Sequence, residues 1–210
     1  MSADSTAAGA WSQIAAGDAV SRSIGLVLLA MSVVSWTLIL SRSWFTWRAS
    51  RSLEPSLQAF WQSGDPAARL AALTPLDRCG LLVPLASTVM TAKTPAERVR
   101  ALRETLGTSR RTLQGGLTVL ASIASTAPFV GLLGTVWGIY HALLGISASG
   151  QASIDRVAGP VGEALIMTAA GLAVAIPALL AYNALVRIQR EILLRLEGFA
   201  HDLQALDAAA

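Results

Sequence analysis

Charged residues are scarce in this chain of 210 residues. Asp, Glu, Lys and Arg make up 14% of it, against roughly 25% in a typical soluble domain, whereas hydrophobic residues make up 53%. The only cysteine, Cys79, excludes an internal disulfide and a cysteine-based metal site. The net charge of +3 is not gathered into a basic face with interleaved aromatic residues, so no nucleic-acid partner is expected. The shortage of charge indicates a lipid environment.

Sequence motifs of common catalytic sites are also missing. The chain has no Gly-x-Ser-x-Gly nucleophile motif, no His-Glu-x-x-His zinc motif and no glycine loop that cradles a phosphate. We therefore expect the protein not to be an enzyme, and we expect no metal or other cofactor.

Three stretches are long and apolar enough to span a bilayer, which takes about 20 residues in a helix. They are residues 23–41, 117–146 and 161–186, and Glu163 is the only charged residue within any of them. The sequence therefore predicts an all-α membrane protein with three transmembrane helices.

The distribution of Lys and Arg predicts the orientation of the chain. Eleven of the 16 basic residues lie between residues 42 and 111, and basic residues close to a span are retained on the cytoplasmic side. The expected segments are a periplasmic N-terminal segment (1–22), transmembrane helix 1 (23–41), a cytoplasmic helical domain (42–116), transmembrane helix 2 (117–146), a periplasmic loop (147–160), transmembrane helix 3 (161–186) and a cytoplasmic C-terminal helix (187–210).

The cytoplasmic segment carries three signals for a helix start. Asp65, Thr74 and Thr94 can each cap a helix, and each is followed by a proline, which suits the first helical position. No further proline occurs between the last of these starts and Pro128, so the helix that follows Thr94 is expected to continue into the second span.

The third span is expected to continue beyond the membrane as well, because apolar residues recur after it at steps of three or four. These residues are Leu185, Ile188, Ile192, Leu196, Phe199, Leu203 and Leu206. Two long helices are therefore predicted to extend into the cytoplasmic domain and to form its core.

Small residues form a stripe at helical spacing in each of the last two spans, a pattern typical of helix contacts in membranes. The stripes are Gly131, Thr135, Gly138, Ala142 and Gly145 in the second span, and Ala164, Thr168, Gly171, Ala175 and Ala178 in the third. Each stripe contains one hydroxyl. A threonine in a membrane helix commonly bonds only its own backbone, but one between glycines also leaves room for water or another helix.

Glu163, Pro128 and Pro177 are the other notable residues of these spans. Glu163 is a functional candidate because a carboxylate in a membrane is costly, but it follows Pro160 closely and could instead stabilise the first turn of a helix. The prolines free backbone carbonyls and are expected to kink their helices.

Three sequence runs resemble the signatures of the ExbB/TolQ proton-channel family, which is related to the flagellar stator subunit MotA. They are Ala-Pro-Phe-Val-Gly-Leu-Leu-Gly-Thr-Val-Trp-Gly-Ile (127–139), Gly-Pro-Val-Gly-Glu-Ala-Leu (159–165) and Thr-Ala-Ala-Gly-Leu-Ala-Val-Ala-Ile-Pro-Ala (168–178). The stretch before the first span, from Trp11 to Arg22, favours the ExbB branch over the TolQ branch.

The resemblance implies a subunit of a proton-driven motor in the bacterial inner membrane. Members of the family form homopentamers around an ExbD-like or TolR-like partner with one span, whose membrane aspartate carries protons. Thr135 and Thr168 would line the pore, Glu163 would be a further pore carboxylate, and the small-residue stripes would face neighbouring helices or the partner.

The implied function is to use the proton motive force to energise a TonB-like protein and, through it, transport across the outer membrane. Two alternatives remain open: a TolQ-type subunit that energises a TolA-like protein for outer-membrane integrity, and a scaffold that conducts nothing. Small-residue stripes serve simple helix packing equally well, and a basic cytoplasmic surface can merely hold anionic lipid.

Overall fold

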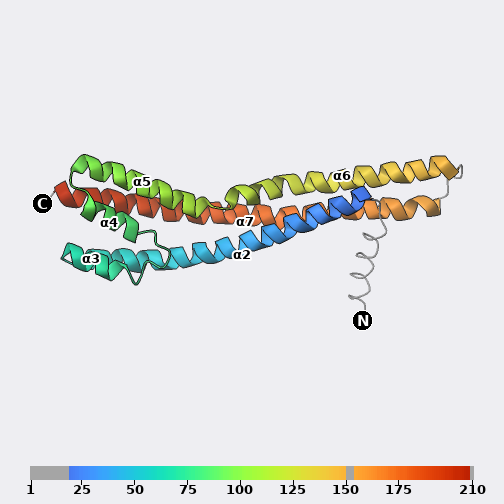
Figure 1. Ribbon diagram of the computed structural model, residues 1–210. Coiled ribbons are helices and arrows are strands. Elements are labelled where there is room, and N and C mark those ends of the chain that lie inside the picture. The colour runs from blue at the N-terminus through green and yellow to red at the C-terminus, as the bar shows by residue number, and fades with distance from the viewer. Residues whose placement is uncertain (1–18, 150–153, 209–210) are drawn as a thin grey trace, which may run out of the picture. The chain divides into compact units, whose positions relative to one another are not determined.

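The computed structural model describes residues 19–149 and 154–208, which form α-helices and contain no β-strand. The helices are α2 (Ala19–Gln62), α3 (Pro66–Leu73), α4 (Val83–Thr91), α5 (Pro95–Gln114), α6 (Leu117–Ser149) and α7 (Ile154–Ala208) (Figure 1). Three stretches are long and apolar enough to cross a membrane: Ala19–Gln62, Pro95–Ser147 and Ala158–Ala205. The predicted fold class, an all-α membrane protein, is confirmed.

The contacts between residues divide the chain into two compact units. Of the described residues, unit 1 comprises those up to Ile39 together with those of Val119–Ala181, and unit 2 comprises Leu40–Thr118 together with those from Tyr182 onward. Helices α2 and α7 each contribute to both units, whereas α3, α4 and α5 belong to unit 2 alone. Each unit is described separately below.

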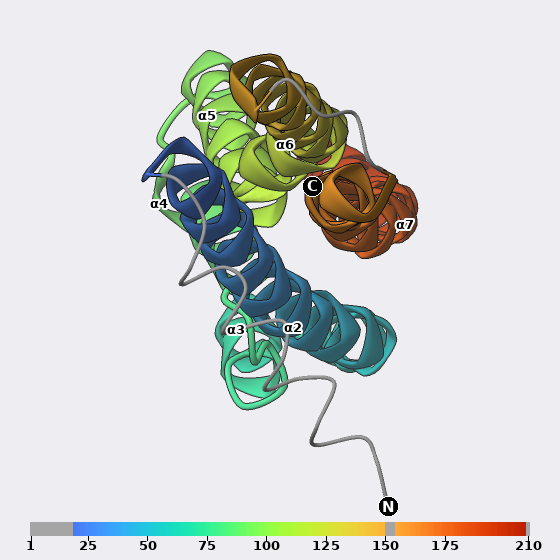
Figure 2. The ribbon, with the colours of Figure 1, turned by 90° about the vertical axis from the view of Figure 1, so that its right-hand side faces the viewer.

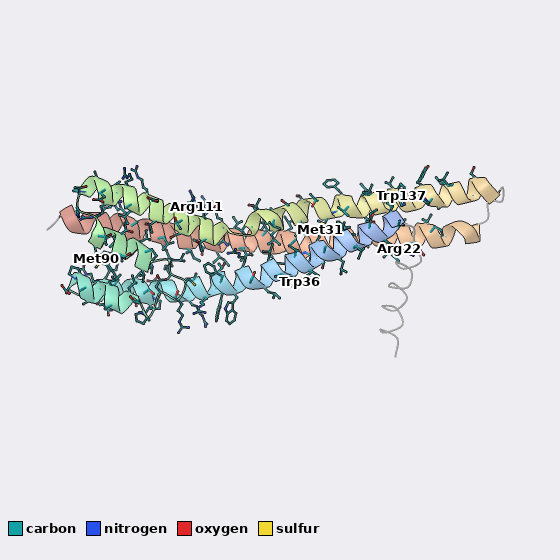
Figure 3. All side chains as sticks on the ribbon, in the orientation of Figure 1. Arg22, Met31, Trp36, Met90, Arg111 and Trp137 are labelled. Carbon is teal, nitrogen blue, oxygen red and sulfur yellow. The ribbon has the colours of Figure 1, made fainter. Side chains whose placement is uncertain are left out.

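Unit 1 has a small core and an apolar surface. Its buried cluster consists of Ile24, Leu28, Ala127 and Ala175, and Met31 packs against this cluster. The larger apolar side chains lie outside: Phe129 is 71% exposed and Trp36 is 52% exposed; Figure 3 labels both Met31 and Trp36. The segments of α6 and α7 run side by side in this unit (Figures 1 and 2). Such a surface suits lipid, because lipid tails are as apolar as leucine.

Unit 2 has the core of a protein that folds in water. Its buried cluster is built from large side chains of α2, α4, α5 and α7, including Leu53, Phe60, Leu85, Leu102, Leu113, Leu196, Phe199 and Leu203. The rings of Phe60 and Phe199 meet edge to face, with centroids 5.0 Å apart, a geometry that aromatic pairs prefer. Glu54 and Arg195 form an ion pair between α2 and α7.

The apolar stripe predicted on α7 is correct except at one position. Leu185, Ile192 and Leu196 are buried, but Ile188 is 37% exposed. Gln189 takes its place and is only 3% exposed. Both residues satisfy a spacing of three or four, so the spacing alone does not choose between them; the side chain of Leu206 lies outside the described residues.

Two of the three predicted helix starts in unit 2 are confirmed. A carboxylate oxygen of Asp65 accepts a hydrogen bond from the backbone N–H of Ala68 at 3.4 Å and caps α3. The hydroxyl of Thr94 accepts one from the N–H of Glu97 at 3.2 Å and caps α5. Each cap supplies a partner for an N–H that the helix itself leaves unpaired.

The helix start predicted at Thr74 is wrong. Thr74 ends α3 instead, and its own N–H donates to the carbonyl of Leu70 at 3.1 Å. The carboxylate of Asp77, which follows in the turn, accepts hydrogen bonds from the backbone N–H groups of Leu81, Leu82 and Val83 at 3.0, 2.8 and 2.8 Å. The capping group of this region therefore serves the N-terminus of α4.

The predicted continuous helix from Thr94 into the second span is also wrong, because Gly115 and Gly116 interrupt it. Gly116 has a φ of +78°, a left-handed conformation that favours glycine. A methyl group added at Gly115 would lie 2.6 Å from Nη2 of Arg42. The other guanidinium nitrogen, Nη1, donates to the carbonyl of Thr112 at 3.2 Å. Arg42 thus brings a positive charge to the C-terminal end of α5, where the helix dipole favours a cation.

Candidate functional site

In unit 1, helices α6 and α7 approach each other so closely that their backbones touch. A methyl group added at Gly131 would lie 2.7 Å from the carbonyl oxygen of Met167, and one added at Gly171 would lie 2.6 Å from the carbonyl oxygen of Ala127. Real Cβ atoms essentially never come this close to backbone atoms, so both positions require glycine. Each of the two glycines therefore lets the facing helix approach to van der Waals contact.

The close contact continues along α6 beyond Gly131. A methyl group added at Gly138 would lie 2.8 Å from the Cβ of Ala164. One added at Gly134 would lie 2.8 Å from the Cβ of Met167 and 3.3 Å from Cγ2 of Ile24. Gly134 is thus the point where α2 joins the pair, and it belongs to neither predicted stripe. Its spacing of three residues from Gly131 was the signal in the sequence that could have identified it.

Thr135 and Thr168, the hydroxyl residues of the two stripes, lie opposite each other in this contact. Their hydroxyl oxygens are hydrogen-bonded to each other. The Thr135 hydroxyl also lies 3.3 Å from the carbonyls of Gly131 and Ala164, and the Thr168 hydroxyl lies 3.3 Å from the carbonyl of Gly131. Both threonines are half-buried. The structure therefore joins the two candidates into one cluster of four oxygen atoms.

The oxygen atoms of this cluster are better suited to bind a positively charged species than a negatively charged one. Four pairs of its oxygens lie within hydrogen-bond distance of each other, but the two hydroxyl groups supply only two hydrogens. The hydrogens can consequently occupy more than one arrangement, and lone pairs of the oxygens remain unused. A water molecule or hydronium ion could therefore donate hydrogen bonds to these oxygens. Rotation of the hydroxyl groups would let each of them switch its hydrogen bond from one carbonyl to another.

Glu163 lies next to Ala164 on α7, and its side chain is exposed. Helix α7 begins at Ile154, so Glu163 is more than two turns inside the helix at 3.6 residues per turn. It therefore lies beyond the first turn, where the positive end of the helix dipole acts. The capping interpretation of Glu163 is wrong, and its placement in an apolar helix needs another explanation.

The remaining residues of the stripes differ in their surroundings. Ala164, Ala175 and Ala178 are buried at 3%, 5% and 0% exposure, and Ala142 is 9% exposed. At Gly145, by contrast, no side chain or backbone atom of the described residues lies within 4 Å of where a Cβ would be.

The prolines of the spans lie within continuous helices. Pro128 is inside α6, and Pro160 and Pro177 are inside α7. That Pro128 and Pro177 kink these helices stays a prediction. Among the residues that the structure describes, no three His, Cys, Asp or Glu side chains are grouped so that they could hold a metal ion.

The chain is similar to proteins of one family. The profile of the MotA/TolQ/ExbB proton channel family matches residues 76–198. The chain is 38% identical over 203 residues to the biopolymer transport protein ExbB of Xanthomonas campestris pv. campestris, covering 88% of this chain and 80% of that protein. It is 39% identical over 201 residues to ExbB of Neisseria meningitidis, with 89% and 91% covered. It is 32% identical over 210 residues to the Tol-Pal system protein TolQ of Pseudomonas aeruginosa, with 93% and 91% covered.

Proposed function

Because the chain belongs to the MotA/TolQ/ExbB proton channel family, we propose that it is the channel-forming subunit of an inner-membrane complex that uses the proton motive force to energise TonB-dependent transport. We propose proton transport and no catalysed reaction. The higher identity to ExbB than to TolQ, 38–39% against 32%, supports the ExbB branch. A TolQ-type subunit that energises a TolA-like protein is the second candidate, and the match to TolQ favours it over the non-conducting scaffold.

The hydroxyl pair of Thr135 and Thr168 is the observation that carries the proposal. A pair of hydroxyls beside two carbonyls, placed in the middle of apolar helices, offers oxygen ligands to a proton on a water molecule where leucine would offer none. Hydrogen bonds between the two helices also help to hold them together, so the proton role of the hydroxyls is tested by flux through assembled complexes. In this proposal the pair is part of the polar wall of the proton path.

The same proposal requires a partner. Glu163 and His141 are the only Asp, Glu or His residues in the three apolar spans, and both lie close to a span end, so a side chain that binds and releases protons deeper in the membrane is expected from another subunit. We assign this role to an aspartate in a single-span, ExbD-like protein, surrounded by a homopentamer of the present chain. The distribution of Lys and Arg supports a periplasmic N-terminus and a cytoplasmic C-terminus.

Proton flux through the reconstituted complex tests the role of the hydroxyls. The chain and its single-span partner are placed in liposomes with an internal pH dye, and flux is followed after a potential is imposed. Thr168→Val removes the hydroxyl but keeps the shape, and we expect flux to fall about tenfold, the factor that corresponds to ~1.4 kcal/mol in the barrier. Thr168→Ser keeps the hydroxyl and should conduct. The same pair of substitutions is made at Thr135.

Thr37→Val is the matched control for these variants. Thr37 lies on α2, is exposed, and donates only to the carbonyl of Val33 in its own helix at 2.8 Å. Loss of the Thr37 hydroxyl should leave the proton flux unchanged. If fully assembled Thr135→Val and Thr168→Val complexes conduct like the wild type, the hydroxyls do not take part in the proton path.

Glu163 is proposed to collect protons at the outer part of the path, because it is an exposed carboxylate in an otherwise uncharged stretch of α7. Glu163→Gln removes the charge and keeps the size, and we expect it to lower flux several-fold at low proton concentration. Glu191→Gln, on the same helix but in unit 2 and paired with Arg187 at 3.7 Å, is the control. Equal flux in Glu163→Gln and the wild type would contradict this role.

A further inference from the structure

The core of unit 2 contains polar side chains in a layer where apolar ones would be expected. On α7, Gln189 lies between Leu185 and Ile192 in the buried stripe and is 3% exposed. On α2, Thr46 lies three residues before Ala49, which is also buried, and is 1% exposed. Both side chains are therefore shielded from bulk water by their own chain.

Contacts further along the same helices indicate that the two polar residues lie at the same level. Helices α2 and α7 run in the same direction in unit 2 (Figure 1), and Glu54 of α2 pairs with Arg195 of α7. At 1.5 Å per residue, Thr46 precedes Glu54 by about 12 Å and Gln189 precedes Arg195 by about 9 Å. Their levels along the bundle thus differ by only about 3 Å by the same measure.

A third helix brings another polar residue to this level. Helix α5 runs opposite to α2 (Figure 1), and Arg42 of α2 reaches the carbonyl of Thr112 on α5. Thr46 follows Arg42 by about one turn, and Ser109 precedes Thr112 by about one turn. Because the two helices run in opposite directions, both steps lead the same way along the bundle. Ser109 is buried at 6% exposure. The level therefore receives one polar side chain from each of three helices.

The polar atoms of Gln189 and Thr46 have no partner within the described part of the chain. The amide oxygen and nitrogen of Gln189 and the hydroxyl of Thr46 are buried, and none of them makes a hydrogen bond to a described residue. Buried polar groups are almost always satisfied by protein or by ordered water. Three unsatisfied atoms at one level of a core call for a ligand that both donates and accepts hydrogen bonds.

We propose that Gln189 and Thr46 bind water inside the core of unit 2, beside Ser109. A cation would leave the Gln189 amide nitrogen, a donor, without a partner, and an apolar ligand would leave all three atoms unsatisfied. Water matches an amide that both donates and accepts and a hydroxyl that does the same, and buried waters typically make about three such bonds. This inference does not depend on the proposed transport function.

Radiolytic footprinting of the full-length chain in detergent tests for the water directly. Hydroxyl radicals formed from a bound water label the side chains beside it even when bulk solvent cannot reach them. Leu185 and Ile192 flank Gln189 at 3% and 2% exposure, and Leu196, at 0% exposure, is the internal control outside the layer. We expect Leu185 and Ile192 to be labelled several times faster than Leu196. Equal labelling of all three would overturn the proposal.

A double-mutant cycle with Thr46→Val and Gln189→Leu provides the second readout. Each single substitution leaves the water with fewer partners and should lower the midpoint of thermal unfolding. The double substitution removes the need for water, should recover or exceed the wild-type midpoint, and should reduce labelling of Leu185 to the Leu196 rate. Non-additivity of this sign shows that the two side chains share a ligand or contact each other, and the labelling distinguishes these two cases.

Two outcomes of the cycle would reject the water site. If both single substitutions raise the midpoint and their effects add, the polar atoms are simply unsatisfied. If the substitutions are coupled but labelling near Gln189 is no faster than at Leu196, the two side chains bond each other without water. The Ser109→Ala variant serves as a check on the third helix, and it should change labelling at Leu185 less than Gln189→Leu does.

Discussion

The two units of this protein share helices α2 and α7 but pack them by opposite rules. In unit 1, α7 buries Ala164, Ala175 and Ala178, whereas large residues such as Leu165 and Leu180 are exposed at 59% and 65%. In unit 2, the same helix buries large side chains such as Leu196, Phe199 and Leu203 and exposes its arginines and glutamates. Size and polarity are thus inverted along one continuous helix.

The solvent of each unit explains this inversion. Water drives apolar surface together, at roughly 25 cal/mol per Å² buried, so the large residues of unit 2 gather in its core. Lipid offers no such drive, and helices in it associate through close packing and interhelical hydrogen bonds. Unit 1 therefore uses glycine, alanine and one hydroxyl pair at its contacts. A helix face should consequently tolerate opposite kinds of substitution in the two units.

The largest effect is expected from removing a large side chain in unit 2. Leu196 is fully buried, and Leu196→Ala should destabilise the protein by about 2–5 kcal/mol, because it loses apolar burial and leaves a cavity. Thermal unfolding of the detergent-solubilised chain measures this as a lower midpoint. Leu194→Ala on the same helix is the control, since Leu194 is 59% exposed. Similar midpoints for the two variants would show that unit 2 does not depend on a packed core.

A smaller effect of the opposite kind is expected in unit 1, where adding a single methyl group should be harmful. Gly131→Ala places its Cβ 2.7 Å from a backbone oxygen of α7, and such overpacking typically costs about 1–3 kcal/mol. We expect a lower midpoint and a reduced fraction of assembled oligomer in size-exclusion chromatography.

Gly145→Ala is the matched control for Gly131→Ala. The added methyl group at Gly145 meets no atom of the described residues within 4 Å, and alanine is the better helix former by about 1 kcal/mol. The variant should therefore be at least as stable as the wild type. If both glycines tolerate alanine, close backbone contact is not what holds α6 and α7 together.

The sequence was sufficient for the features that depend on one helix at a time. The apolar spans and the caps at Asp65 and Thr94 follow from local composition and spacing, because each involves residues close together in the chain. The small-residue stripes could be read in the same way. Their pairing could not, because nothing in either stripe says that Thr135 meets Thr168 across the contact.

The errors of sequence reasoning arose where the residues allow more than one local arrangement. The absence of proline suggested a continuous helix through Gly115, but the Arg42 guanidinium from another helix occupies the space beside it. Pro75 suggested a helix start after Thr74, but Asp77 satisfies the N–H groups of a later helix instead. The Gly115-Gly116 pair was a turn signal visible in the sequence, whereas the choice of Asp77 over Thr74 as the capping residue does not follow from spacing alone.

The smallest effect concerns a single thiol and tests whether bulk water is kept from the edge of the unit 2 core at Cys79. Cys79 packs against the buried cluster, and burial raises its pKa above the usual range, assisted by the negative charge of Asp77 and opposed by the positive charge of Arg48. A higher pKa leaves less thiolate at a given pH, and the thiolate is the form that reacts.

We therefore expect iodoacetamide to alkylate Cys79 several times more slowly at pH 7.5 than a thiol at an exposed site, with the rate still rising at high pH. Ala67→Cys in a Cys79→Ser background supplies that exposed thiol, because residue 67 lies on the surface of α3. Arg48→Gln removes the charge that favours the thiolate, so it should slow alkylation of Cys79 further. Equal rates for the two cysteines, or faster alkylation in Arg48→Gln, would mean that water reaches this edge of the core.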